Sequence, residues 1–259
     1  MSKQYINLEA KKWIHIFLLI IYKTNSSSIM NAVNNNNTLA AAIIRFAIQA
    51  TLIVVGILGI VFTANSYSFM GGSSVFLFFT VQSNIYIIAM SFLFLVLEII
   101  NLLTKKNYVN QVLLDIKYVA TVAITITFLV FFTMLAPTLG LDYLLSFNNY
   151  SLHAIVPILA IIDFIIFDAK EINLSYPRSL LATISPIAYV NFVYIGVQFK
   201  LQYAENLYFP YFFLNYETNG FFFEKGFGVV PWIAILVVAI SGLCLLFALF
   251  VKLRQKHQH

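Results

Sequence analysis

Hydrogen-bonding side chains interrupt an apolar stretch of the chain at residues 80–84, in the order Thr-Val-Gln-Ser-Asn. On a helix, Thr80 and Asn84 lie on one face, with Ser83 beside them. Gln82 points elsewhere. Such side chains are costly in lipid unless they face the interior of a helix bundle. They therefore indicate either hydrogen bonds between helices, which is the more ordinary use of these residue types, or a reactive site.

A second candidate, His153, lies near the start of another apolar stretch, four residues before Pro157. An ionisable residue in or beside a membrane is a functional candidate, although a structural histidine bonded to a loop carbonyl explains it equally well. Helix-rise arithmetic places Thr80 at the same membrane face as His153 and about 6 Å deeper. A hydroxyl within reach of an imidazole is the minimum for nucleophilic catalysis, because the base must accept the hydroxyl proton. The two side chains can therefore share one cavity.

Six long apolar stretches must position these residues. Most of them can cross a hydrocarbon core of about 30 Å at about 1.5 Å per residue, and unpaired backbone groups in lipid require them to be helical. A hydrophobic fraction of 61% with only 10% charged residues excludes an ordinary soluble domain. We therefore predict an all-α, polytopic membrane bundle of six transmembrane helices. The stretches are Leu39–Phe62, Val75–Ile100, Tyr118–Ala136, Leu152–Phe167, Ser179–Phe199 and Val229–Val251.

The positive charges are distributed unevenly among the connecting segments. All but two of the 15 Lys and Arg residues lie in the N-terminal segment, the second and fourth loops and the tail; the exceptions are Lys200 and Lys225. Positive-inside bias puts both termini in the cytoplasm of a multi-pass protein, which we expect in a plasma membrane. The predicted divisions are a cytoplasmic extension over 1–38, a transmembrane domain over 39–251 and a basic tail over 252–259. This distribution explains the net charge of +5 without a nucleic-acid partner.

Several familiar chemistries have no counterpart in the chain. The metalloprotease, phosphate-loop and serine-elbow motifs do not occur, and Cys244 has no second cysteine to pair with. We expect no cofactor and no metal site, since the tail residues His257 and His259 are better explained as solvated. The apolar run Trp13–Tyr22 is too short to span a membrane and is consistent with an interfacial helix or a signal-like segment.

Asp163 is the most deeply placed acidic residue. It lies about 15 Å beyond His153 along a helix, too far to orient that imidazole as the acid of a triad. We expect it to pair with Asn191, Tyr189 or a cation, or to contribute to a proton path.

Other polar and irregular positions have simpler interpretations. Asp168 is expected to be solvated near Lys170 at the cytoplasmic boundary, and Arg45 to extend to the same interface. Pro186 predicts a kink in the fifth helix. The aromatic, proline-containing segment 208–214 is expected to lie at or dip into the outer interface.

The chain resembles the Pr6Pr family of bacterial six-helix membrane proteins. That family is related to the animal androgen-induced-gene and androgen-dependent-TFPI-regulating-protein hydrolases. The resemblance extends from Leu39 to Val251, and its motifs are 79–84, 152–157, Asp163 with 167–168, and 208–214.

The resemblance implies an intramembrane threonine hydrolase that cleaves fatty acid esters of hydroxy fatty acids, with Thr80 as nucleophile and His153 as its partner. Membrane lipids and a lipid-like small molecule are then the expected partners, and no protein partner is indicated. A non-catalytic lipid-binding or small-solute transport protein is the alternative, and a structural or assembly factor a third possibility. The candidate substrate-binding or oxyanion residues are Ser83, Asn84, Gln82, Asp163, Tyr208 and Tyr211.

Overall fold

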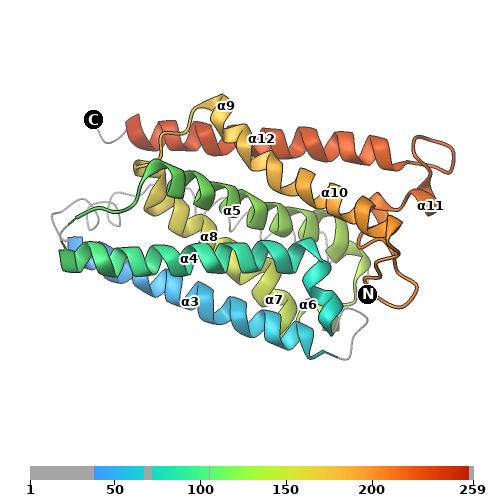
Figure 1. Cartoon of the computed structure of the whole chain (residues 1–259), viewed down its shortest axis with the longest axis horizontal. Coiled ribbons are helices and arrows are strands. Elements are labelled where there is room, and N and C mark those ends of the chain that lie inside the picture. The colour runs from blue at the N-terminus through green and yellow to red at the C-terminus, as the bar shows by residue number, and fades with distance from the viewer. Residues whose placement is uncertain (1–37, 67–71, 105, 257–259) are drawn as a thin grey trace.

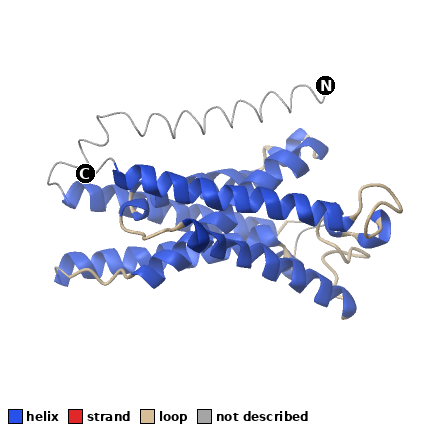
Figure 2. Ribbon diagram, turned by 90° about the horizontal axis from the view of Figure 1, so that it is seen from above, coloured by secondary structure: helices blue, strands red, loops and turns tan. Residues whose placement is uncertain are grey.

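The computed structural model describes residues 38–66, 72–104 and 106–256, which form a bundle of long helices (Figure 1). Within these residues, six helical segments are long and apolar enough to cross a membrane, which confirms the predicted all-α bundle of six spans. Figure 2 shows the loops gathered towards the two ends of the bundle. The predictions for the N-terminal extension, Trp13–Tyr22 and the two tail histidines lie outside the described residues. The spans are Ala40–Ala64, Phe79–Thr104, Gln111–Thr138, Phe147–Lys170, Tyr176–Gln198 and Val229–Lys256.

Two helices, α5 (Gln111–Val130) and α8 (Val156–Ile166), form the centre of the bundle. Most residues of the spans that contain them are buried, whereas few residues of the other four spans are. The helices α3 (Thr38–Ala64) and α4 (Phe79–Thr104) pack against this centre and against each other. Their outward faces carry large exposed apolar side chains, as expected of helices that face lipid.

The remaining helices pack on the other side of α5 (Figure 1). They are α10 (Ile184–Gln198) and α12 (Val229–Lys256). The short elements are η1 (Ser73–Leu77), η2 (Phe131–Leu135), η3 (Ala136–Thr138), α6 (Leu141–Leu144), α7 (Phe147–Tyr150), η4 (Ser151–Ile155), η5 (Asp168–Lys170), α9 (Tyr176–Ser179), η6 (Leu180–Thr183), η7 (Phe212–Leu214) and α11 (Tyr216–Asn219).

Two of the short elements, η2 and η4, are π-helical turns, and each ends two residues before a proline. Pro137 and Pro157 have no N–H to bond the carbonyl four residues earlier, so the regular helix ladder is interrupted at both places. Isolated π turns of this kind are frequent at functional sites. In the fifth span, where a kink is expected at Pro186, the 3-10 turn η6 ends three residues before that proline and α10 follows it directly.

The third span begins earlier than the sequence predicts. It starts at Gln111, after the Asn110 side chain caps the helix by accepting a hydrogen bond from the Leu113 N–H at 3.0 Å. Lys117 consequently lies inside α5 and is buried, so its assignment to the second loop was wrong. A single lysine in an apolar run looks like the edge of a span when its partners are distant in sequence.

Candidate functional site

Thr80 and His153 meet inside the bundle. Thr80 is in the first turn of α4 and His153 is in the π turn η4, and both side chains are buried. The Thr80 Oγ1 atom lies 3.3 Å from His153 Nε2. This distance is slightly longer than an ideal hydrogen bond, as is common for a nucleophile and its base before substrate binds.

A second contact of the imidazole determines which ring nitrogen carries the proton. His153 Nδ1 lies 3.1 Å from the backbone carbonyl oxygen of Asn149. A carbonyl can only accept, so Nδ1 is the donor and the neutral ring presents a lone pair at Nε2. Thr80 therefore donates its hydroxyl proton towards His153, which is the arrangement a general base requires.

The ring of Phe131 holds the imidazole in its plane. The two rings stack with their centroids 3.8 Å apart and an interplanar angle of 23°. Phe131 opens the π turn η2, so both members of this stack come from π turns next to prolines. The local irregularity of two spans thus determines the orientation of His153.

The side chains of Asn84 and Ser83 both hydrogen-bond the Thr80 carbonyl oxygen, so their donors are not available to a substrate. Asn84 Nδ2 donates to the carbonyl oxygens of Thr80 (2.7 Å) and Leu152 (3.1 Å), which commits both amide protons. The Ser83 hydroxyl contacts the Thr80 carbonyl at 3.1 Å and the Thr127 hydroxyl at 2.7 Å. These bonds tie α4 to η4 and α5. The expectation that either side chain stabilises an oxyanion therefore does not fit the geometry.

The structure does not bring Gln82 or Tyr208 to Thr80. Gln82 Nε2 turns back to the carbonyl oxygens of Phe76 (3.2 Å) and Leu77 (3.4 Å) in η1. The Tyr208 hydroxyl accepts a hydrogen bond from Gln202 Nε2 at 3.0 Å in an exposed part of the fifth loop.

Tyr211 is the candidate from the aromatic segment that reaches the site. Burial raises the pKa of Tyr211 to about 12, against a smaller lowering by hydrogen bonds to Thr80 and Tyr189. The phenol consequently keeps its proton at neutral pH and can donate a hydrogen bond. Tyr189, which the sequence analysis did not place here, donates to the Leu77 carbonyl at 3.1 Å.

A cavity of about 70 Å³ opens beside Thr80, with Phe131, Tyr189 and Tyr211 in its lining. The rest of its wall is almost entirely apolar, contributed by α5, α10, η7 and α12. His153 does not line it, so the hydroxyl of Thr80 is the member of the pair that a molecule in the cavity reaches.

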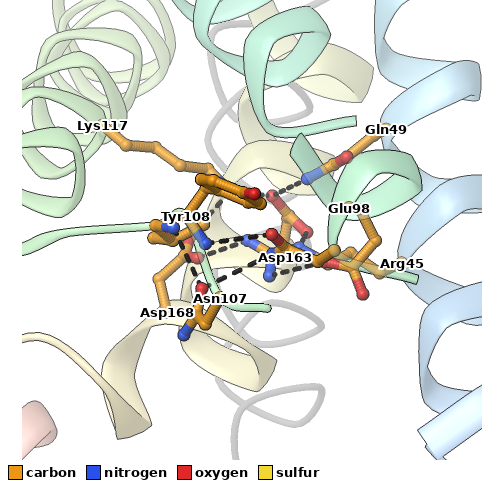
Figure 3. Close-up of polar contacts among 10 residues, drawn as sticks. Arg45, Gln49, Glu98, Asn107, Tyr108, Lys117, Asp163 and Asp168 are labelled. Carbon is orange, nitrogen blue, oxygen red and sulfur yellow. Dashed lines mark hydrogen bonds and ion pairs between the residues drawn. The ribbon is translucent and has the colours of Figure 1, made fainter. Parts of the chain in front are cut away.

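A network of buried charges joins α3, α5 and α8, and it is the second polar cluster of the bundle (Figure 3). Lys117 Nζ lies 2.5 Å from Asp163 Oδ2 and 2.6 Å from Asp168 Oδ2. Arg45 Nη2 lies 2.5 Å from Asp168 Oδ1, and its Nε is 3.6 Å from Asp163 Oδ1. Two cations thus neutralise two carboxylates that are each only 1% exposed.

Further contacts complete this ion network. Gln49 Nε2 donates to Asp163 at 3.2 Å, and Arg45 Nη1 lies 3.6 Å from the partly exposed carboxylate of Glu98. Lys117 Nζ also sits 4.3 Å from the centre of the Phe94 ring. Gln49 follows Arg45 by four residues, and that helical spacing is a signal from which it could have been found.

This network confirms one of the alternatives predicted for Asp163 and corrects two other sequence expectations. Asp163 pairs with cations, one of the alternatives considered, whereas Asn191 donates instead to the Ile187 carbonyl at 2.8 Å. Asp168 is not solvated and Arg45 does not extend to the interface, because both are buried against each other. Opposite charges can be buried inside a bundle when they neutralise and hydrogen-bond one another.

Fold and site together define a multi-pass membrane protein with a buried hydroxyl–imidazole pair beside an apolar cavity. Among the described residues, no group of three or more His, Cys, Asp or Glu side chains could hold a metal ion. The chain matches no protein-family model, no curated protein and no solved structure. The resemblance to the Pr6Pr family therefore stays a prediction.

Proposed function

We propose that this protein is an intramembrane hydrolase that cleaves the ester bond of lipid-like molecules, with Thr80 as nucleophile and His153 as general base. The observation that carries the proposal is the 3.3 Å approach of Thr80 Oγ1 to His153 Nε2, on an imidazole whose Nδ1 faces the Asn149 carbonyl oxygen at 3.1 Å. Hydrogen-bonded threonines are common in membrane bundles, but here the partner is an oriented imidazole beside a cavity, which is the arrangement of a nucleophile and its base.

In the first half of the reaction, Thr80 Oγ1 attacks the ester carbonyl carbon while His153 Nε2 takes the hydroxyl proton. The carbonyl oxygen becomes an oxyanion, to which the Tyr211 hydroxyl donates a hydrogen bond. The intermediate collapses by breaking the bond to the alcohol oxygen, and His153 returns the proton to this leaving group.

In the second half, water attacks the acyl group now held on Thr80. His153 accepts a proton from this water, and the bond between the acyl carbon and Thr80 Oγ1 breaks. The threonine hydroxyl is regenerated and the carboxylic acid leaves. His153 passes the proton taken from water to Thr80 Oγ1, so one base serves both halves of the reaction, and Tyr211 is the other side chain that this mechanism uses.

The surroundings favour a lipophilic substrate. The cavity wall is apolar, and it lies within helices that span the membrane. The resemblance to the Pr6Pr family supports fatty acid esters of hydroxy fatty acids as substrates and a bacterial plasma membrane as the location. With both termini cytoplasmic, as positive-inside bias favours, Thr80 faces the outer leaflet.

Labelling with a lipophilic fluorophosphonate tests the assignment. Mass spectrometry of the wild-type protein in mild detergent should find the adduct on Thr80, and His153→Ala should abolish it. Thr80→Ser keeps a hydroxyl and should retain labelling. Thr125→Ala removes another buried hydroxyl, one bonded to the Thr121 carbonyl at 2.6 Å, and should label as wild type. Absence of an adduct in folded protein, or near-wild-type ester hydrolysis by Thr80→Ala, would refute the proposal.

The ion network favours a second candidate, a lipid-binding or solute-transport protein. Charged residues within membrane spans often mark ion or proton pathways. Proton-coupled uptake that is abolished by Asp163→Asn and unaffected by Thr80→Ala would support it. Against it, both oxygens of Asp163 and of Asp168 lie within 3.6 Å of Lys117 or Arg45, which is the geometry of a structural cluster.

A further inference from the structure

A second cavity lies between α10 and α12, next to the one at Thr80. Its volume is about 270 Å³. Four residues line both cavities, two from α10 and two from α12: Pro186, Val190, Leu236 and Ile240. The two spaces therefore meet at a shared wall, and we refer to the outer one as the α10–α12 cleft.

The packing of α12 explains why a cleft exists here. α12 packs against α9, η6 and η7; Lys252 near its C-terminal end lies over the Tyr176 ring of α9, and Trp232 near its start contacts the Phe212 ring of η7. The cleft lies between these two regions of contact. Pro186 lies in its wall, in the first turn of α10, which follows the 3-10 turn η6.

The sizes of the two cavities imply that they act together. A space of about 70 Å³ holds only a few atoms beside the Thr80 hydroxyl. Small-molecule sites usually have volumes of about 300–1,000 Å³. Only with the additional 270 Å³ of the cleft does the space reach that range. An ester held at Thr80 must therefore extend the rest of its chain between α10 and α12.

The rim of the cleft has the chemistry of an opening to lipid. Ile187 is 49% exposed and Val237 is 46% exposed, one from each of the two helices. Asn191 also lines the cleft and is exposed, with one of its amide protons donated to the Ile187 carbonyl. An exposed amide on a membrane span is costly beside pure hydrocarbon, so the lining suits an amphiphile whose chain carries a polar group.

We propose that the α10–α12 cleft is the lateral passage through which the acyl chain of a membrane lipid ester reaches Thr80. The identity of the ester rests on the proposed hydrolase function. Occupation of the cleft by an acyl chain does not depend on catalysis, so the two proposals can be tested separately.

The passage is tested by filling it. Ile233→Trp and Ser241→Trp place an indole in the cleft, at positions of α12 that do not line the cavity at Thr80. Leu246→Trp is the matched control, because Leu246 is a 63% exposed leucine of the same helix α12 and does not line the cleft. Each protein is photolabelled in vesicles with a palmitoyl ester that carries a diazirine on its acyl chain, and mass spectrometry locates the adducts. Hydrolysis of a palmitoyl ester and of an acetyl ester of the same alcohol is measured in parallel.

We expect wild type and Leu246→Trp to be labelled on residues of α10 and α12 that line the cleft. The two filling variants should lose that labelling. They should hydrolyse the palmitoyl ester more slowly by a factor of about ten or more, with acetyl ester hydrolysis little changed. Unchanged labelling in both filling variants, or an equal loss for both esters, would overturn the passage. Labelling of the cleft by a protein that hydrolyses neither ester would refute the hydrolase function and leave the cleft as a lipid site.

Discussion

Replacing Lys117 by methionine should strongly destabilise the fold without touching the candidate active site. Lys117 Nζ contacts Asp163 at 2.5 Å and Asp168 at 2.6 Å, and all three side chains are 1% exposed. Methionine fills a similar volume but supplies no charge, so Arg45 is left to compensate two buried carboxylates. Removing one partner of a buried ion pair costs about 3–5 kcal/mol, because the remaining charge is uncompensated.

The expected size of the effect follows from the length of the chain. For domains of about 150–250 residues, 1 kcal/mol corresponds to about 2–4 °C in Tm, so Lys117→Met should lower Tm by about 6–20 °C. Thermal unfolding of the purified protein in one mild detergent measures this shift. Lys106→Met, which alters an exposed lysine of the preceding loop, is the matched control and should change Tm little.

A double variant separates charge from packing. Lys117→Met combined with Asp163→Leu removes one charge of each sign and leaves Arg45 paired with Asp168 at 2.5 Å. We expect this protein to be more stable than Lys117→Met alone, which is the non-additivity of residues in one network. A Tm for Lys117→Met within about 2 °C of wild type, or simple additivity in the double variant, would refute the description of this cluster as a mutually neutralised unit.

Three further changes probe the close contacts and the chemistry. Gly59→Ala should lower Tm, because the added methyl group would collide with the side chain of Ser151 where α3 packs on η4. In the control Gly242→Ala, the added methyl group has no atom within 4 Å, so the free energy of unfolding should rise by about 0.5–1 kcal/mol. Pro157→Ala restores a backbone N–H, so the π turn η4 should relax to a regular helix and rotate the His153 imidazole away from Thr80. Fluorophosphonate labelling should then decrease, and unchanged labelling would contradict the role given to that turn. Tyr211→Phe should lower kcat about 10²-fold with little change in KM if the phenol stabilises the oxyanion, and an unchanged kcat would exclude that role.

The spans were predictable because hydropathy over some twenty residues depends on the local sequence alone. The juxtaposition of Thr80 and His153 was within reach for a similar reason, since topology and helix rise place both residues at one end of their helices. The π turns were not predictable, although Pro137 and Pro157 marked where the helix ladder would break.

The partners of the buried charges were beyond sequence reasoning. Arg45 and Asp168 are 123 positions apart, and nothing local to either residue indicates the other. Rules that count loop charges place an isolated Lys117 outside the membrane, which is the commonest location of lysine next to an apolar run. The orientation of Asn84 was likewise open, because two carbonyl oxygens in the folded bundle decide where its amide points.

The ion network also has a consequence for how the protein is made. Its cations lie on α3 and α5, whereas its two fully buried carboxylates lie on the later α8 and η5. During synthesis, the segments that carry Arg45 and Lys117 therefore leave the ribosome before those that carry Asp163 and Asp168, and Glu98 of α4 is the acid of the network that precedes Lys117. Cations that lack part of their neutralising set are unfavourable in the bilayer, so we expect the early spans to be less stably integrated until the fourth span arrives. Ribosome-bound chains that end before Asp163 should accordingly be extracted from the membrane more readily than chains that extend beyond Asp168.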